Sequence, residues 1–185
     1  MSYTAKDLGR AFRTVRENTI QIAEDIPADQ YGFKPAEGSR TVAQTLAHIA
    51  MMPSIPMQIH GQRMAELTFQ NFRAMMPLEQ AAEAELTTKD DIIKALHNEG
   101  EEFATFVELL PDAVLAEVVH FAPPIEPSSK TRFEMLMSVK EHEMHHRGQL
   151  MLVERILGLV PHLTRNQQER MAKMNQQQAG AQHAG

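Results

Sequence analysis

The chain contains no cysteine and no tryptophan, and tyrosine occurs only twice among its 185 residues. Without cysteine, the protein can form no disulfide and can offer no thiolate of its own to a metal ion or a substrate. Any metal ion must therefore be held by nitrogen and oxygen atoms. The absence of cysteine is also compatible with a reducing compartment, and we expect a cytoplasmic protein.

Long apolar runs and clusters of positive charge are missing as well. The N-terminal residues lack the apolar core of a secretory signal, and no stretch reaches about 18 consecutive apolar residues. The net charge is -6, and the basic residues are scattered instead of gathered in one patch. We therefore expect neither a membrane nor a nucleic acid as a partner.

Apolar residues recur at three- and four-residue steps along most of the chain, which is the period of helices with one buried face. Nothing alternates with a period of two for long, so no strand is expected. The fold class is therefore all-α, and a four-helix bundle with long connecting loops is the economical architecture. The pattern predicts main helices at about 4–26, from near 40 into the fifties, at 88–110 and at about 130–158.

Proline and polar residues mark the ends of these helices. Ser39 is the expected N-cap of the second helix, and Pro53 and Pro56 should kink or restart it. Within 63–78, a short helix is expected to end before Pro77.

The third and fourth helices have clearer limits. Thr87 or Thr88 caps the third helix, and Gly158 supplies the C-terminal stop of the fourth. We expect the helical bundle to form one domain over residues 1–160. Residues 161–185 are a polar, glutamine-rich tail, whose start can be a short helix and whose end we expect to be disordered.

Three of the nine histidines fall in the run EHEMHHRG. His142 and His146 are four residues apart, so on a helix their side chains lie one above the other, roughly 6 Å apart, and both can bind one metal ion. Met135 and Val153 lie on the same stripe, so we expect the pair to point into the bundle. His145 is turned about 60° away from this line, which makes it a weaker candidate.

A metal site needs a third ligand, and spacing alone does not identify it. His48 is the single histidine on an otherwise apolar face of the second helix, where a hydrogen-bonded core role competes with a ligand role. For the same reason, His60, His97 and His120 remain alternative candidates for the third ligand.

No catalytic residue follows from the pattern. Gln149, one turn beyond the histidine pair, is a candidate pocket residue, and so is Met135; Gln149 could equally brace its helix. Glu141 and Glu143 lie beside the pair, and we expect both on a solvated helix face.

Two blocks of the sequence resemble a known family. They are GSRTVAQTLAHIA at 38–50 and KEHEMHHRGQLMLVERILGLVP at 140–161. Together they resemble the DinB/YfiT-like superfamily of metal-binding four-helix bundles, over about residues 5–160. The second block is the more specific one, because it carries the family's HxxHHRGQ motif.

The resemblance implies a complete ligand set. Carried over to this chain, the family's three metal ligands fall on His48, His142 and His146, and the implied cofactor is a divalent metal ion, zinc or nickel. The family also implies a homodimer. It usually carries tryptophan before the histidine of its second helix, whereas Arg40 or Thr41 stands there in this chain, so the shape of the pocket should differ.

Three neutral nitrogens leave an ion with open positions, which is typical of a catalytic metal site. The resemblance implies a metal-dependent enzyme that acts on a small molecule, either a transferase that uses a low-molecular-weight thiol or a hydrolase. The alternative is a metal-binding stress or accessory protein without turnover. An acid or base beside the open positions would distinguish the two classes, and the sequence places none there.

Overall fold

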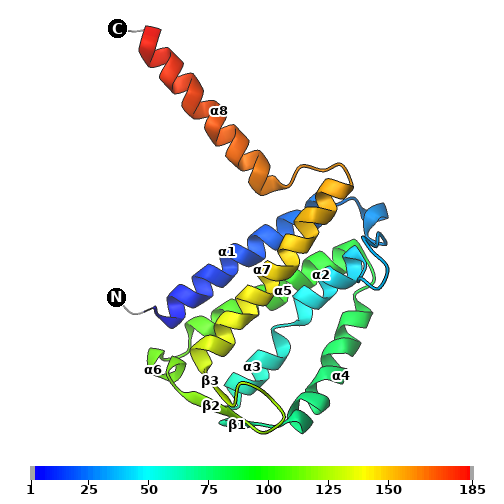
Figure 1. Ribbon diagram of the computed structural model, residues 1–185, viewed down its shortest axis with the longest axis vertical. Helices are drawn as coiled ribbons and strands as arrows, with labels where there is room; N and C mark the ends of the chain where they lie inside the picture. Colours follow the sequence, from blue (N-terminus) through cyan, green and yellow to red (C-terminus); the bar gives the residue numbers. More distant parts are fainter. Residues whose placement is uncertain (1–2, 184–185) are drawn as a thin grey trace.

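The main helices pack side by side, and a small sheet and a projecting C-terminal helix extend from them (Figure 1). The computed structural model describes residues 3–183. In that part of the chain, no helix has the length and hydropathy needed to cross a membrane. The elements are α1 (Ala5–Asp25), η1 (Ala28–Gln30), α2 (Val42–Met51), α3 (Ser54–Gly61), β1 (Glu66–Leu67), α4 (Phe69–Glu85), α5 (Lys89–Glu108), α6 (Asp112–Leu115), β2 (Val118–Phe121), β3 (Ser129–Thr131), α7 (Arg132–Ile156) and α8 (His162–His183).

Helices α1, α2, α5 and α7 form the bundle. α1 packs against α5 and α7, and α2 packs against the same two helices. α4 lies outside these four, against α2 and α3 (Figure 1). The predicted all-α fold with a four-helix core is confirmed, and α4 is an addition to that core.

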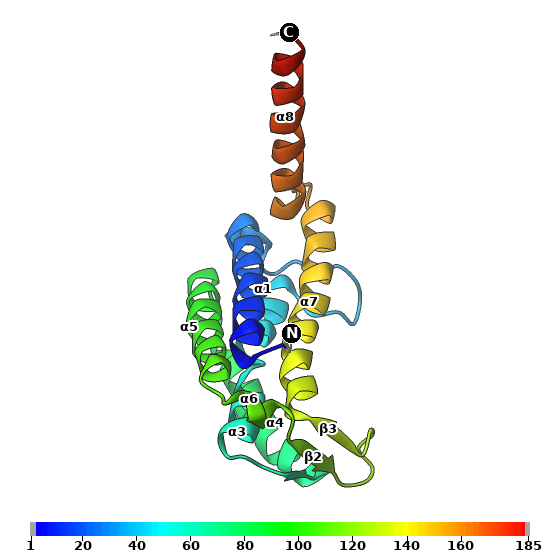
Figure 2. The ribbon, with the colours of Figure 1, turned by 90° about the vertical axis from the view of Figure 1, so that its left-hand side faces the viewer.

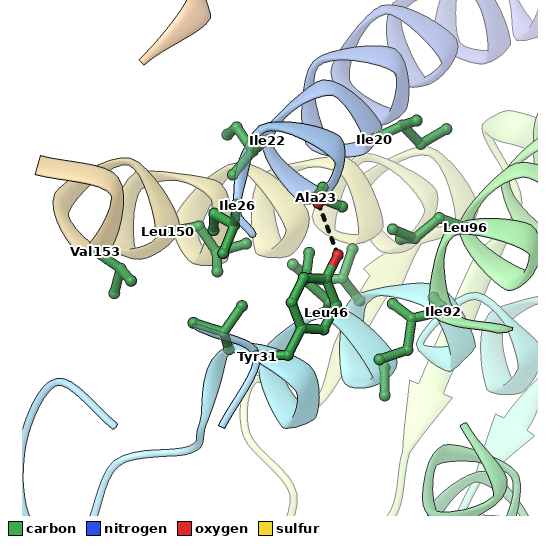
Figure 3. Packing of buried hydrophobic residues seen from close by; sticks show 14 residues of the cluster. Ile20, Ile22, Ala23, Ile26, Tyr31, Leu46, Ile92, Leu96, Leu150 and Val153 are labelled. Atoms are coloured by element: carbon green, nitrogen blue, oxygen red, sulfur yellow. Dashed lines mark hydrogen bonds between the residues drawn. The ribbon is translucent and has the colours of Figure 1, made fainter. Parts of the chain in front are cut away.

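Apolar side chains from all four helices meet in one core (Figure 3). Tyr31 closes this core, and its hydroxyl donates a hydrogen bond of 2.7 Å to the carbonyl of Ala23. The core holds α2 against α7, the two helices that carry the predicted metal ligands. Among its almost fully buried members are Ile22, Leu46, Leu96 and Leu150.

Threonine begins five of the helices. In each case its hydroxyl accepts a hydrogen bond from the backbone N–H three residues further on, which satisfies a donor that the first helical turn leaves free. Ser39, the predicted cap of α2, does not cap this helix, because its hydroxyl donates to the carbonyl of Ala36 in the preceding turn. The five caps are Thr4, Thr41, Thr68, Thr88 and Thr131.

Proline does not end α4, which corrects the prediction of a short helix that stops before Pro77. The helix runs through Pro77 to Glu85. Proline removes the backbone hydrogen bond to the carbonyl four residues earlier, here that of Arg73, and Arg73 is exposed, so water can replace the lost donor. Pro53 acts as predicted, since α2 ends before it and α3 begins after it.

A three-stranded sheet, which the sequence did not predict, lies at the end of the bundle where α7 begins (Figure 1). β1 pairs in parallel with β2, and β2 pairs antiparallel with β3. These strands contain only two to four residues, so they are too short for an alternating pattern to reveal them.

Helix α8 projects away from the bundle (Figure 2). The sequence predicted at most a short helix here and a disordered end, whereas α8 continues to His183. Two contacts hold its beginning to α1: Nε2 of His162 lies 2.9 Å from the side-chain oxygen of Asn18, and Arg165 donates to Asp25 at 2.6 Å. Residues 184–185 lie outside the described residues, and the division into a domain and a tail stays a prediction.

A buried ion pair joins all four helices of the bundle. Nε of Arg16 in α1 donates to both carboxylate oxygens of Glu143 in α7, at 3.0 and 3.1 Å. Its two terminal nitrogens donate to the carbonyl of Leu96 in α5 and to that of Ile49 in α2, each at 2.9 Å. Both charged side chains are almost completely buried.

Glu143 therefore corrects a prediction. The sequence placed it on a solvated face because it points away from the histidine stripe, but that side of α7 faces α1 instead of solvent. Gly100 of α5 leaves room for the arginine, since a Cβ at this position would lie 2.7 Å from Cγ of Arg16. Glu141 is exposed, as predicted.

We expect the substitution Arg16→Met to lower the free energy of unfolding by about 3–5 kcal/mol, because it leaves the Glu143 carboxylate buried without a partner. Urea unfolding followed by circular dichroism measures the change. Arg10→Ala is the control, since the pair of Arg10 with Asp7 lies at the surface, where solvent screens it, and its loss should change the free energy of unfolding far less. Small and equal losses in the two variants would contradict the central role of Arg16.

Candidate metal centre

Three imidazole rings meet where α2 faces α7. Nε2 of His142 lies 3.1 Å from Nε2 of His48 and 3.0 Å from Nε2 of His146. The three nitrogens are close enough to one another to hold one metal ion. The structure thus brings the predicted ligand set together, while the binding of an ion stays a prediction.

The site is partly open to solvent, which corrects the expectation that both histidines of α7 point into the bundle. His146 is buried and His48 is half-buried, but His142 is exposed. The histidine stripe runs along the margin of the buried face of α7, because the centre of that face is occupied by Leu136, Glu143 and other fully buried side chains. The open side leaves an approach for a small molecule.

Hydrogen bonds at the far ring nitrogens fix the tautomers of two histidines. Nδ1 of His48 lies 2.7 Å from a carboxylate oxygen of Glu83, which can only accept, so Nδ1 carries the proton. Nδ1 of His146 lies 2.8 Å from the side-chain oxygen of Gln149, whose amide nitrogen in turn faces His145 at 3.1 Å. Nδ1 of His146 therefore donates as well.

These tautomers test whether a metal ion suits the site. A neutral imidazole carries one proton, so Nε2 of His48 and Nε2 of His146 both present lone pairs. Nε2 of His142 faces both atoms and can donate a proton to only one of them. At least one pair of nitrogens therefore meets lone pair to lone pair, which is unfavourable unless a cation lies between them. The donor set fits a divalent metal ion.

The surroundings also favour the neutral imidazoles that metal binding needs. Although the His142 side chain reaches solvent, its ring is partly desolvated by the surrounding groups, which lowers its pKa to about 4, and the neighbouring His146 and His48 act in the same direction. Burial likewise lowers the pKa of His146, against the hydrogen bond with Gln149, which raises it.

Helix α4 adds two carboxylates that the sequence reasoning missed. Glu83 holds His48, and Glu79 lies one helical turn earlier, so that ligand atoms of these three residues lie within 4.8 Å of one another. Burial raises the pKa of Glu79 to about 7, and the charge of Glu83 adds to the effect. Two acids four residues apart would mark one face of a helix, but the predicted helix ended before Pro77.

Two hollows flank the three histidines. The first, called the apolar hollow, has a volume of about 490 Å³, is lined by α3, α4, α7 and the connection from β2 to β3, and includes His48 and His142. The second, called the Arg40 hollow, has a volume of about 600 Å³, lies between α7 and the start of α2, and includes Arg40 and His146. Both volumes are in the usual range for small-molecule sites.

The structure separates the two predicted pocket residues. Met135 lines the apolar hollow, together with Glu79, whereas Gln149 lines the Arg40 hollow. Gln149 also braces His146, so both of its predicted roles are compatible with its position. His145 is exposed and makes its side-chain hydrogen bond to Gln149, which agrees with its exclusion from the ligand set.

The other candidate histidines stay apart from the site. His60 is buried and contacts Arg132, while His97 and His120 are exposed. Of the alternatives that spacing left open, His48 alone joins the histidine pair in space.

Comparison with known proteins agrees with this fold. The family model described as the DinB superfamily matches residues 11–150, a range that includes all three histidines. The solved structure of a DinB-like protein from Bacillus subtilis resembles this one with a TM-score of 0.61 and 22% identity, covering 82% of this chain and 91% of that chain. A DinB-like protein from Bacillus cereus gives a TM-score of 0.66 and 16% identity, covering 87% and 97%. No curated protein matches the chain. At these identities the solved structures show a shared fold alone.

We expect His142→Ala and His146→Ala to abolish stoichiometric metal binding, because each removes a nitrogen that faces the other two. Elemental analysis of protein purified without a metal-affinity tag measures the metal content. His145→Ala is the control on the same helix and should keep the metal. Loss of metal in His145→Ala together with its retention in His146→Ala would show that the ligands are wrongly assigned.

We expect Glu83→Gln to weaken zinc binding by about 10–100-fold, because the carboxylate orients His48 and raises the basicity of its Nε2. Competition with a chromophoric chelator measures the affinity. Glu85→Gln, an exposed position at the end of the same helix, should leave the affinity unchanged. Equal affinities in the two variants would rule out this role of Glu83.

Proposed function

The chain belongs to the DinB superfamily, and on that premise we propose that it is a metal-dependent enzyme that transfers a low-molecular-weight thiol to a small electrophilic molecule. His48, His142 and His146 would hold the divalent ion, and zinc or nickel suits three imidazole nitrogens. The ion would supply Lewis-acid chemistry that favours the anionic form of a neighbouring thiol. Because the chain has no cysteine, the thiol must be a cosubstrate.

The observation that carries the proposal is the pair of hollows that flank the histidines. His48 and His142 line the apolar hollow, and His146 lines the Arg40 hollow, so the two hollows flank the histidine cluster from different sides. A transfer reaction must bring two molecules to one centre, and two separate hollows provide for both. A hydrolase needs room for one substrate and a water molecule.

The Arg40 hollow is the better place for the thiol. In the described part of the chain, the guanidinium of Arg40 forms no ion pair, although it lies near His142 and His146 and influences both. A thiol compound that carries a carboxylate could form a bidentate pair with this guanidinium. Its sulfur would then lie toward the histidines and its electrophilic partner in the apolar hollow.

Glu79 is the residue best placed to accept the proton of the thiol. It lines the apolar hollow beside His48 and His142, and its own carboxylate forms no hydrogen bond with the described residues. Once the sulfur has lost its proton to Glu79, it forms a bond to the electrophilic carbon while the leaving group departs with its electron pair. The three histidines would hold the ion between the two hollows, and the walls of the hollows would keep the sulfur and that carbon close together.

A second candidate function is hydrolysis at the same site. The position of Glu79 favours it, because a carboxylate beside open ligand positions can equally take a proton from water. The two functions differ in whether a thiol is consumed.

We expect zinc- or nickel-loaded protein to accelerate the displacement of bromide from monobromobimane by cysteine, above the uncatalysed rate, as measured by fluorescence. Glu79→Gln should lower kcat by about a hundredfold, because it removes the base, and should leave the metal content unchanged. Glu85→Gln is the matched control on α4 and should keep full activity.

The outcomes separate the candidate functions. Acceleration that requires both the metal and the thiol supports the transferase. Metal-dependent cleavage of p-nitrophenyl acetate without a thiol, and no thiol transfer, would support the hydrolase. Metal binding without turnover in either assay would support the non-catalytic accessory protein. The expected homodimer stays a prediction.

A further inference from the structure

The apolar hollow is elongated along three helices. α7 contributes Met135, Ser138, Val139 and His142 to it, which are spaced so that they form one face of the helix. Such spacing means that the lining follows the helix axis instead of crossing it. The same spacing occurs in α4, with Phe72, Met76 and Glu79, and in α3, with Ile55, Pro56 and Ile59.

The two ends of the hollow differ in chemistry. His48, Glu79 and His142 lie at one end. Met135 and His142 are about 10 Å apart along α7 at the helical rise per residue, and Lys130 precedes the helix altogether. Lys130 therefore lies at the other end, together with Ile125, Glu126 and Pro127 of the connection between β2 and β3.

Between these ends the wall is mainly apolar. It consists of methionine, isoleucine, phenylalanine, proline and valine side chains, with Ser138 and His60 as the polar exceptions. Methionine adapts its shape to irregular apolar ligands. The middle of the hollow therefore suits an unbranched or flexible apolar body.

Lys130 is a cation without a partner of its own. It is half-buried on β3, and among residues 3–183 its ammonium group makes no ion pair and no side-chain hydrogen bond. The charge of Lys130 acts on the nearby Glu134 carboxylate, but no ion pair joins the two. Glu134 instead accepts hydrogen bonds of 2.7 Å from the backbone N–H and the hydroxyl of Thr131, in the capping box that begins α7. Glu126 also lines this end but is exposed. A half-buried ammonium gains stability from an anion brought to it.

The wall also contains a hydrogen-bond donor without an acceptor. Arg132 can only donate, so Nδ1 of His60, 3.1 Å away, accepts from it. Burial keeps His60 neutral by lowering its pKa to about 4, and its proton must then be on Nε2. Nε2 is buried and has no partner in the described part of the chain. His60 thus leaves one unpaired polar atom close to an otherwise apolar wall.

We infer that the apolar hollow binds a medium-chain molecule with an apolar body and a carboxylate at the end remote from the histidines, and that Lys130 pairs with this carboxylate. The inference rests on the proposed function in one respect: the reacting group of the molecule would lie at the histidines. The binding of the apolar body and the carboxylate depends on the hollow alone.

Octanoate and octanol are matched probes, since they share the apolar chain and differ in the charge of the head group. Isothermal titration of the full-length, metal-free protein measures their binding without competition from a metal ion for the carboxylate. Octanoate should bind about tenfold more tightly than octanol, and Lys130→Gln should remove this difference while octanol binding is kept. Lys130→Arg should retain the difference, and Lys94→Gln, an exposed position on α5, should not change it.

Equal binding of octanoate and octanol to the wild-type protein would overturn the inference. So would a preference for octanoate that survives Lys130→Gln and is lost in Arg40→Gln, because the anion would then occupy the other hollow. Thiol transfer without the octanoate preference would leave the proposed function intact and refute the substrate class. The preference without any turnover would refute the proposed function and support the binding site.

Discussion

The geometry of the whole bundle depends on one buried cation. Arg16 binds Glu143 of α7 and the carbonyl of Ile49 in α2, which are the chain neighbours of His142 and His48. Because a buried charge that loses its partner is strongly destabilising, these contacts permit little movement of one helix relative to the other. The distance between the ligand-bearing helices is therefore set by an interaction that includes none of the ligands.

Helix α4 turns the edge of this bundle into a site. The four central helices bring the histidines to a margin that would otherwise be open to solvent. α4 packs against α2 there and supplies Glu83 to orient His48, Glu79 as a nearby carboxylate, and one wall of the apolar hollow. α4 thus adds two carboxylates and one wall of the apolar hollow to the four-helix bundle.

Much of this arrangement follows from local rules that act within a few residues. The cap at Thr88 and the break at Pro53 were readable because a cap or a break depends on neighbours along the chain, although Ser39 was preferred to Thr41 as the cap of α2. Pro77 was misread because its cost depends on whether water can reach the carbonyl of Arg73, which is a property of the surface. Glu143 was misread because the helical period separates two faces of α7 but does not say which face meets another helix.

The sequence by itself determined the four helices of the bundle, the paired spacing of His142 and His146, and, through the lack of cysteine, a nitrogen and oxygen donor set. It identified His48 only through resemblance to a family. Only the tertiary structure decided that Nε2 of His142 lies 3.1 Å from Nε2 of His48 and 3.0 Å from Nε2 of His146. It also decided that Glu83 holds the His48 ring and that two hollows flank the cluster. The reason is physical: the backbone fixes distances along one helix, whereas distances between helices come from packing.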